Sequence, residues 1–330
     1  MALTMQNYAS VLRVDGSLNT FEGVHWLIPI GSAAVSYRNQ YQQHTLLLPV
    51  SSQPKIRYDP YSLLGHFLGP GSTEVATRYV VEDLRTTKSF VTRKVEAWQD
   101  WSSLPGKKQD SENGGRRRIS VLLLDFHVPV GASMFEYNDM PLHATPSPST
   151  TSHGDSAAFI ASISENCSSP DKLRTPADFF FSSYPPQKSA QLDVPFTRRS
   201  NSIWSKLRHP PSFPTPFGQP NEAEASGVHE AAVAFFMDAT LGAVPLSFSS
   251  RSLQDASSFS TLELSLRFLR PPDFSEWMLE EQTTEAGSGE RTGSTGKVWD
   301  MQGRLVAVLT NFSIMWPRLQ KHDGKSTKPK

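Results

Sequence analysis

The chain repeats one series of segments in its two halves, and this repeat constrains the fold more than any single motif. Each half carries a Phe-Leu-x-Pro turn, at 67–70 and again at 268–271, followed by a long ribbon-like stretch. Each then ends in a run of apolar residues, at 119–129 and at 304–316. Units of roughly 100 residues are too long for solenoid repeats. We therefore predict two similar domains joined in one chain.

Charge and cysteine content exclude several classes of protein. The 330 residues include 32 basic and 32 acidic side chains, so the formal net charge is zero, whereas nucleic-acid-binding proteins usually carry a basic excess. The single cysteine, Cys167, has no partner for an intrachain disulfide, which is typical of a reducing compartment. A catalytic thiol is disfavoured, because Cys167 lies in a stretch rich in serine and proline.

Targeting signals and membrane spans are not recognisable in the sequence. No run of apolar residues is long enough to cross a membrane. The first residues do not follow the pattern of a signal peptide, and the final Lys-Pro-Lys differs from the peroxisomal Ser-Lys-Leu signal. We therefore expect a cytoplasmic protein.

Composition divides the chain into four parts. We predict a first domain at 1–136 and a second domain at 222–318, with a polar, basic tail at 319–330. Between the domains, 137–221 is predicted to be a partly disordered linker, because 13 of the 25 prolines fall there. Proline interrupts both helices and strand ladders, so such a stretch rarely packs as a regular element.

Hydrophobic periodicity predicts the secondary structure. Helices are expected at 28–41 and from Glu222 onward. The stretch 101–118 is predicted to be an expanded hairpin loop, and 203–207 a packed island in the linker. A helix wrapped by an antiparallel sheet, twice, is an α+β fold. Strands, recognised by β-branched and aromatic residues, are expected at 58–70, 78–100, 260–270, 276–286, 291–300 and 304–316.

Two polar residues occupy positions that the pattern assigns to a core. Asp238 follows Ala231 and Phe235 at helical spacing, and Asn311 lies in the apolar strand 304–316. A buried carboxylate must be paired, hydrogen-bonded or protonated, and a buried amide needs partners. Together the two could hold a water for attack on an activated carbonyl. Alternatively, Asp238 pairs with an arginine or caps backbone N–H groups, and Asn311 satisfies a bulge.

Signatures of other enzyme classes are missing. The sequence has no Gly-x-Ser-x-Gly elbow, no His-Glu-x-x-His motif and no paired cysteines at zinc-binding spacing. The triplet Gly324-Lys325-Ser326 lacks the upstream glycine of a phosphate-binding loop. These absences disfavour α/β-hydrolases, zinc enzymes and P-loop proteins.

Several blocks resemble the TesB-type acyl-CoA thioesterases, also called acyl-CoA thioesterase II, which have a double hotdog fold. The second half contributes AVAFFMDATLGAVPL (232–246), STLELSLRFLRPPDFSEWMLEE (260–281) and GKVWDMQGRLVAVLTNFSIM (296–315). The first half contributes FLGPGS (67–72) and DLRTTKSFVTRKVEAWQD (83–100). The blocks occur in the family's order. The resemblance implies two antiparallel sheets, each wrapped around a central helix.

The resemblance also implies three site residues. The family holds its hydrolytic water with an aspartate, a threonine and a glutamine. The aspartate matches Asp238 and the threonine matches Thr261. Asn311 stands at the place of the glutamine and is shorter by one methylene. Strand alternation groups Thr261 with Glu263 and Ser265 on a polar face, so an exposed threonine is the alternative.

The implied function is hydrolysis of the thioester of an acyl-CoA or an acyl-carrier protein. The resemblance implies no metal and no redox cofactor, and it leaves assembly into a homo-oligomer open. The long insertions at 101–118 and 137–221 favour a specialised role in a secondary-metabolite pathway. We expect neither a nucleic-acid partner nor a membrane span.

Asn311 and the divergent first half favour an alternative function. In this alternative, the chain is a catalytically weak hotdog protein that binds acyl thioesters or serves as an assembly partner. A hotdog hydratase is disfavoured, because no histidine follows Asp238 closely in the sequence.

Overall fold

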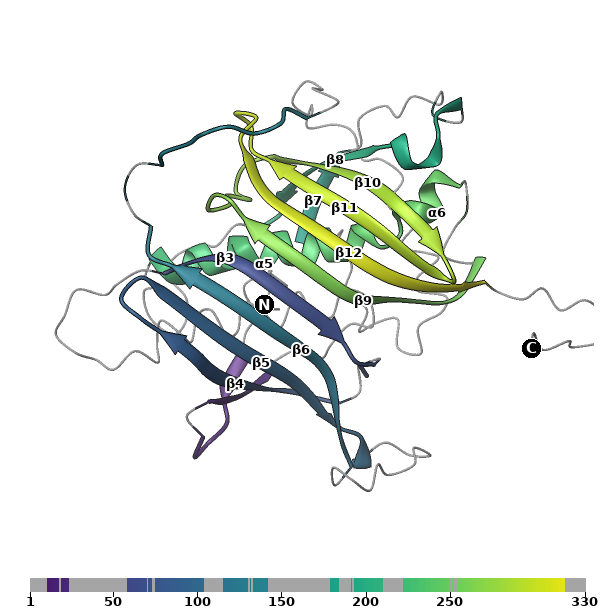
Figure 1. Ribbon diagram of the computed structural model, residues 1–330. Coiled ribbons are helices and arrows are strands. Elements are labelled where there is room, and N and C mark those ends of the chain that lie inside the picture. Colours follow the sequence, from purple (N-terminus) through teal and green to yellow (C-terminus); the bar gives the residue numbers. More distant parts are fainter. Residues whose placement is uncertain are drawn as a thin grey trace, which may run out of the picture.

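The computed structural model contains one antiparallel sheet of twelve strands within the part of the chain that it describes (Figure 1). The predicted helix at 28–41 and the whole basic tail at 319–330 lie outside this part, as does Cys167. The described residues are 11–17, 19–23, 58–69, 71–72, 75–103, 115–129, 131, 133–141, 179–183, 191, 193–209, 222–249, 251 and 255–317.

The strands fall into two sets of six. The first set is β1 (Val11–Arg13), β2 (Thr20–Gly23), β3 (Asp59–Phe67), β4 (Thr77–Thr86), β5 (Phe90–Asp100) and β6 (Arg116–His127). The second set is β7 (Phe180–Ser183), β8 (Asn201–Leu207), β9 (Ala256–Phe268), β10 (Met278–Ser288), β11 (Arg291–Trp299) and β12 (Leu305–Pro317). The helical elements given for the described residues are α5 (Glu222–Leu241), α6 (Val244–Phe248) and the 3-10 turns η1 (Trp101–Ser103) and η5 (Phe196–Arg198).

The strand order reads the same from either edge of the sheet. It runs β1-β2-β4-β5-β6-β3 and then β9-β12-β11-β10-β8-β7, so each strand of one half has a counterpart in the other. The repeated Phe-Leu-x-Pro turns also match, because Leu68 donates its backbone N–H to Ile119 and Leu269 donates its own to Val306. The internal repeat predicted from the sequence is therefore confirmed as a repeat of topology.

The two halves are joined by backbone pairing between β3 and β9. These strands run antiparallel, with Leu63 opposite Leu266 and His66 opposite Glu263. Because the ladder crosses the boundary between the halves, they form one continuous sheet rather than two separate ones.

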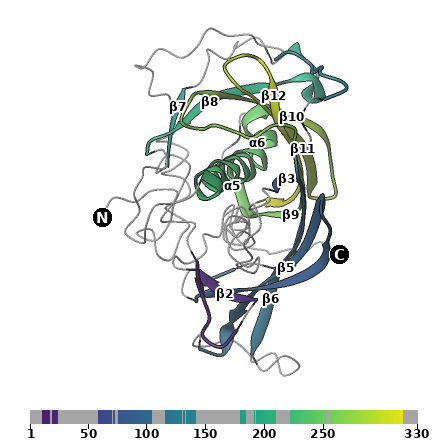
Figure 2. The ribbon, with the colours of Figure 1, turned by 90° about the vertical axis from the view of Figure 1, so that its left-hand side faces the viewer.

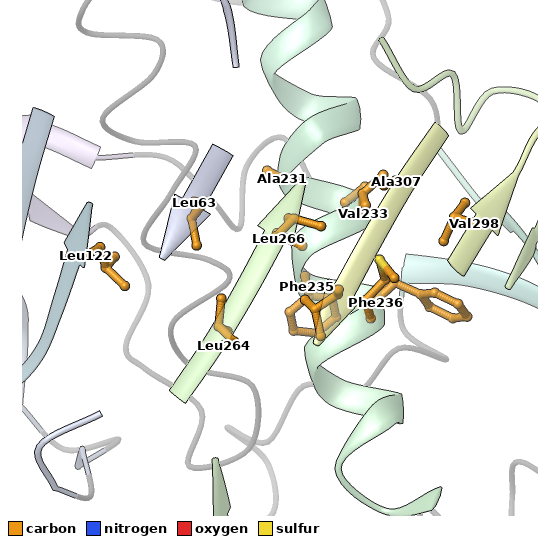
Figure 3. Close-up of a cluster of buried hydrophobic side chains, with 14 of the residues drawn as sticks. Leu63, Leu122, Ala231, Val233, Phe235, Phe236, Leu264, Leu266, Val298 and Ala307 are labelled. Carbon is orange, nitrogen blue, oxygen red and sulfur yellow. The ribbon is translucent and has the colours of Figure 1, made fainter. Parts of the chain in front are cut away.

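Helix α5 occupies the concave side of the curved sheet, as Figure 2 shows. Almost every side chain between Val228 and Leu241 is buried, which is typical of a helix surrounded by protein on all sides. Phe235 and Phe236 pack with residues from both halves of the sheet, including Leu63 and Leu266, in one hydrophobic core (Figure 3). None of the described helices has the length and apolar character of a membrane span.

The second half of the sheet begins earlier than the sequence predicts. Strands β7 and β8 lie within 137–221, the predicted linker, and β8 contains the island predicted at 203–207. The aromatic side chains of Phe180 and Trp204 are buried there, which stabilises these short strands despite the surrounding prolines.

Boundaries elsewhere in the sheet differ from the predictions in smaller ways. The predicted strand 78–100 is a hairpin, with β4 and β5 joined by a turn in which Thr87 hydrogen bonds to Phe90. Strand β6 begins at Arg116, so the end of the predicted loop 101–118 belongs to the sheet. Arg117 and Arg118 stack over Trp101 and Trp98, which allows charged residues to continue the strand.

Candidate active site

Asp238 lies in the last turn of α5, and its side chain is buried. Only 3% of the residue is exposed, as the helical spacing predicts. Burial raises the pKa of Asp238 to about 6, and a hydrogen bond from Thr261 acts in the opposite direction. No arginine pairs with Asp238 among the described residues, so the ion-pair alternative is not supported. Asp238 therefore changes its charge close to neutral pH.

Thr261 faces the helix because β9 contains a bulge. Opposite β12, Glu263 pairs with Phe312 and Thr261 pairs with Ser313, so Leu262 is an extra residue. A single extra residue reverses the alternation of side chains along a strand. The Thr261 hydroxyl consequently donates to Oδ1 of Asp238 at 3.1 Å. The alternative of an exposed Thr261 on a polar strand face is not supported for this reason.

Asn311 is buried on the inner face of β12, as its strand pattern predicts. It is 1% exposed, and its Nδ2 lies 3.4 Å from the Thr261 Oγ1, at the long end of the hydrogen-bond range. Its Oδ1 accepts a hydrogen bond of 2.6 Å from the hydroxyl of Ser313, which is fully buried. The structure thus brings together all three predicted site residues and adds Ser313, which the sequence reasoning missed.

The four side chains form a directional series of hydrogen bonds. Ser313 donates to Asn311, Asn311 donates to Thr261, and Thr261 donates to Asp238. The series ends on Oδ1, while Oδ2 of Asp238 has no hydrogen-bond partner in the described part of the chain. This second oxygen is buried and retains its capacity to accept a hydrogen bond, which a general base requires.

A small cavity of about 30 Å³ lies along the same face of α5 as Asp238. Ala231 and Ala234 line it, and Ala234 stands one helical turn before Asp238. Its other walls come from β3, β6 and β9, so it lies between the two halves of the sheet. The lining is largely apolar, with Ser62 and Glu230 as polar exceptions.

Two models of the acyl-CoA thioesterase family match the sequence. The N-terminal domain model matches residues 32–106, and the C-terminal domain model matches residues 170–313. Together they match well over half of the chain. The chain belongs to the acyl-CoA thioesterase family. The match from residue 170 onward also includes β7 and β8 in the second thioesterase domain.

Solved structures confirm the double hotdog fold of this family member. The chain is similar to acyl-CoA thioesterase II TesB2 from Mycobacterium marinum, with 19% identity, a TM-score of 0.62, and coverage of 96% of this chain and 99% of that one. A tesB protein from Mycobacterium avium subsp. paratuberculosis has 15% identity, a TM-score of 0.62, and coverage of 95% and 98%. A hot-dog-fold protein from Alicyclobacillus acidocaldarius has 15% identity, a TM-score of 0.59, and coverage of 97% and 100%. A sequence search of curated proteins finds no significant match.

This thioesterase family member contains another buried carboxyl group with a raised pKa, which the sequence reasoning missed. Glu280 on β10 is 1% exposed, and burial raises its pKa to about 8, although Gln282 and Thr240 act in the opposite direction. The Thr240 hydroxyl donates to Glu280 Oε2 at 3.1 Å. Every residue of Met278–Gln282 is buried, so this stretch does not alternate between buried and exposed side chains. The strand pattern in the sequence therefore did not single out Glu280.

His229 on α5 has a structural partner. Its Nδ1 accepts a hydrogen bond of 3.0 Å from the backbone N–H of Phe274, which ties the helix to the segment before β10. Burial lowers the pKa of His229, although Asp273 acts in the opposite direction. The histidine therefore has a packing role on α5, nine residues before Asp238.

Proposed function

We propose that this chain hydrolyses the thioester bond of an acyl-CoA or acyl-carrier-protein substrate. Asp238 orients a water and accepts its proton, while Thr261 and Asn311 hold the water and the carboxylate in place. The observation that carries the proposal is the buried carboxylate of Asp238, which has one oxygen bound by Thr261 and the other without a partner in the described residues. Membership of the acyl-CoA thioesterase family supports the choice of substrate.

The pKa of Asp238 suits a base at neutral pH. With a pKa raised to about 6, the carboxylate is mostly deprotonated at pH 7, yet it is a stronger base than an exposed aspartate. The attacking water gives its proton to Oδ2, and its oxygen bonds to the thioester carbonyl carbon. The tetrahedral intermediate then expels the thiolate, which takes up a proton, so the products are a carboxylic acid and a thiol.

The small cavity between the two halves, of about 30 Å³, supports a place for the first carbons of the acyl chain. Its apolar walls suit an alkyl chain, and its position beside Ala234 puts it one helical turn from Asp238. The pantetheine arm would also lie in the space between the hotdog halves, on the other side of the thioester carbonyl from the acyl chain. We further propose that the substrate belongs to a specialised, secondary-metabolite pathway, because the chain diverges from the family pattern and carries the long stretches 101–118 and 137–221.

Release of free thiol tests the proposal. Acyl-CoAs of short, long and branched chains are supplied to the wild-type protein and to Asp238→Asn, and thiol is measured with a colorimetric reagent. We expect release by the wild type with a preferred chain length, and a loss of about a thousandfold or more in the variant because the base is removed. Unchanged circular dichroism should show that the variant folds. Retained turnover by Asp238→Asn would contradict the proposal.

A second function is favoured by one observation, the long contact of 3.4 Å between Asn311 and Thr261. In this function the chain binds acyl thioesters without hydrolysing them, or assembles with another protein. Calorimetric titration with a non-hydrolysable acyl-CoA thioether measures binding separately from turnover. Binding together with no thiol release from any acyl-CoA or acyl-carrier-protein substrate would favour this second function.

A further inference from the structure

We propose that Ser313 is a positioning residue that fixes the orientation of the Asn311 amide and thereby controls the proton affinity of Asp238. The inference rests on the proposed hydrolytic function for its catalytic meaning. Its structural content concerns only the hydrogen bonds among four side chains, of which Asp238, Asn311 and Ser313 are buried and Thr261 is partly buried. It can be tested without turnover.

Distance and chemistry assign the direction of each hydrogen bond. The 2.6 Å separation between the Ser313 oxygen and Asn311 Oδ1 fits an O–H···O bond, which is usually shorter than an N–H···O bond. Because Oδ1 is engaged, the amide nitrogen must point the other way, where the Thr261 oxygen lies at 3.4 Å. The Thr261 hydroxyl has only one proton. Because the Asn311 amide donates to the Thr261 oxygen, the Thr261 hydroxyl donates its own proton to Asp238.

Without the Ser313 hydroxyl, the Asn311 amide has no fixed direction. Its oxygen would then be a buried acceptor without a donor, which costs about 1–3 kcal/mol. If the amide flipped, its oxygen and nitrogen would exchange places, and the oxygen would accept a hydrogen bond from the Thr261 hydroxyl. Asp238 would lose the hydrogen bond that stabilises its charged form, so its pKa would rise further above its usual value.

The fold holds Ser313 in the position that this role needs. Ser313 pairs with Thr261 across β9 and β12, immediately after the bulge. On its other side lies Gly242, just beyond α5, where an added methyl group would lie 3.1 Å from the Ser313 oxygen. The absence of a side chain at Gly242 therefore leaves room for the hydroxyl between the helix end and the sheet.

The test measures the carboxyl pKa of Asp238 directly. Protein labelled with ¹³C at aspartate carboxyls is titrated by NMR, and the Asp238 signal is identified by its loss in Asp238→Asn. We expect Ser313→Ala to raise the Asp238 pKa by about half a unit or more, because a charge-stabilising hydrogen bond is lost. Ser313→Cys, a weaker donor of similar volume, should give a smaller rise and serves if the alanine variant folds poorly.

Ser294→Ala is the matched control. Ser294 is also a buried strand serine and pairs with Asn311 across β11 and β12, but its hydroxyl has no hydrogen-bond partner in the described residues. The Ser294→Ala substitution should leave the Asp238 pKa unchanged. An unchanged pKa in Ser313→Ala and Ser313→Cys, or an equal rise in Ser294→Ala, would overturn the role of Ser313.

Turnover gives the second measurement and separates this inference from the proposed function. In Ser313→Ala we expect kcat at pH 6 to fall by about tenfold, with KM nearly unchanged, and part of the loss to be recovered at pH 8. A pKa rise in a protein that releases no thiol would support the positioning role while contradicting hydrolysis. Thiol release with no change in pKa or pH profile would contradict the positioning role alone.

Discussion

The hydroxyl of Thr261 donates to the carboxylate of Asp238 at 3.1 Å, although the two residues lie on different elements. The contact depends on the extra residue Leu262, which turns Thr261 from the outer face of β9 toward α5. It is the only hydrogen bond to the Asp238 side chain within the described residues. Among the described residues, this one hydrogen bond therefore opposes the effect of burial on the carboxylate's charge.

The rate of hydrolysis should rise with pH through the pKa of Asp238. Because the deprotonated carboxylate is the active form, kcat/KM should increase from acid toward neutral pH and level off above a pKa of about 6. Thr261→Val removes the hydrogen bond that lowers this pKa, so the acid limb should move to higher pH and the plateau should fall. Thr261→Ser keeps the hydroxyl and should retain the wild-type midpoint. A pH–rate profile that is the same for Thr261→Val and wild type would contradict the role of this contact.

Stability should fall with rising pH because of Glu280. Its folded-state pKa of about 8 lies above the unfolded value, so the folded protein holds a proton that the unfolded chain releases between about pH 4.5 and 8. The full contribution is present below pH 4.5 and is lost as pH rises through 8. It amounts to roughly 5 kcal/mol at about 1.36 kcal/mol per pKa unit. Glu280→Gln cannot ionise, so its urea midpoint should vary less over this range. Equal pH dependence in both proteins would refute the prediction.

A methyl group at Gly242 should disturb both packing and the site. Its Cβ would lie 2.5 Å from the Phe259 ring and 3.1 Å from the Ser313 oxygen. Overpacking of this kind typically costs about 1–3 kcal/mol, so Gly242→Ala should lower the free energy of unfolding and reduce kcat. At Gly287 the added Cβ meets only ordinary contacts from 3.5 Å, so Gly287→Ala is the control. Equal stability of the two variants in chemical denaturation would count against this packing argument.

The two halves of the sheet should unfold together. Leu266 of β9 is fully buried opposite Leu63 of β3, at the junction of the halves. Leu266→Ala should cost about 2–5 kcal/mol and shift a single transition, because the core on both sides shares this contact. Leu269→Ala, at an exposed position, should change stability by about 0.5 kcal/mol or less. Two separate transitions in calorimetry would show that the halves are energetically independent.

The sequence by itself determined the architecture and two of the site positions. The repeat predicted two matching halves, and periods of 3.6 and 2 residues placed Asp238 and Asn311 in the core, where both are buried. Such patterns report which face of a regular element is apolar. They remain informative wherever the element is unbroken, as α5 and β12 are around these residues.

Tertiary structure alone decided the features that depend on one irregular residue or on partners distant in sequence. Period-2 alternation placed Thr261 on the wrong face, because an extra residue in a strand shifts the period without a sequence signal of its own. Ser313 and Glu280 gain their roles from Asn311 and Thr240, which come close only when the sheet wraps α5. The pKa of Asp238 follows from the same wrapping, since exclusion of water by packed neighbours, rather than any local motif, raises it.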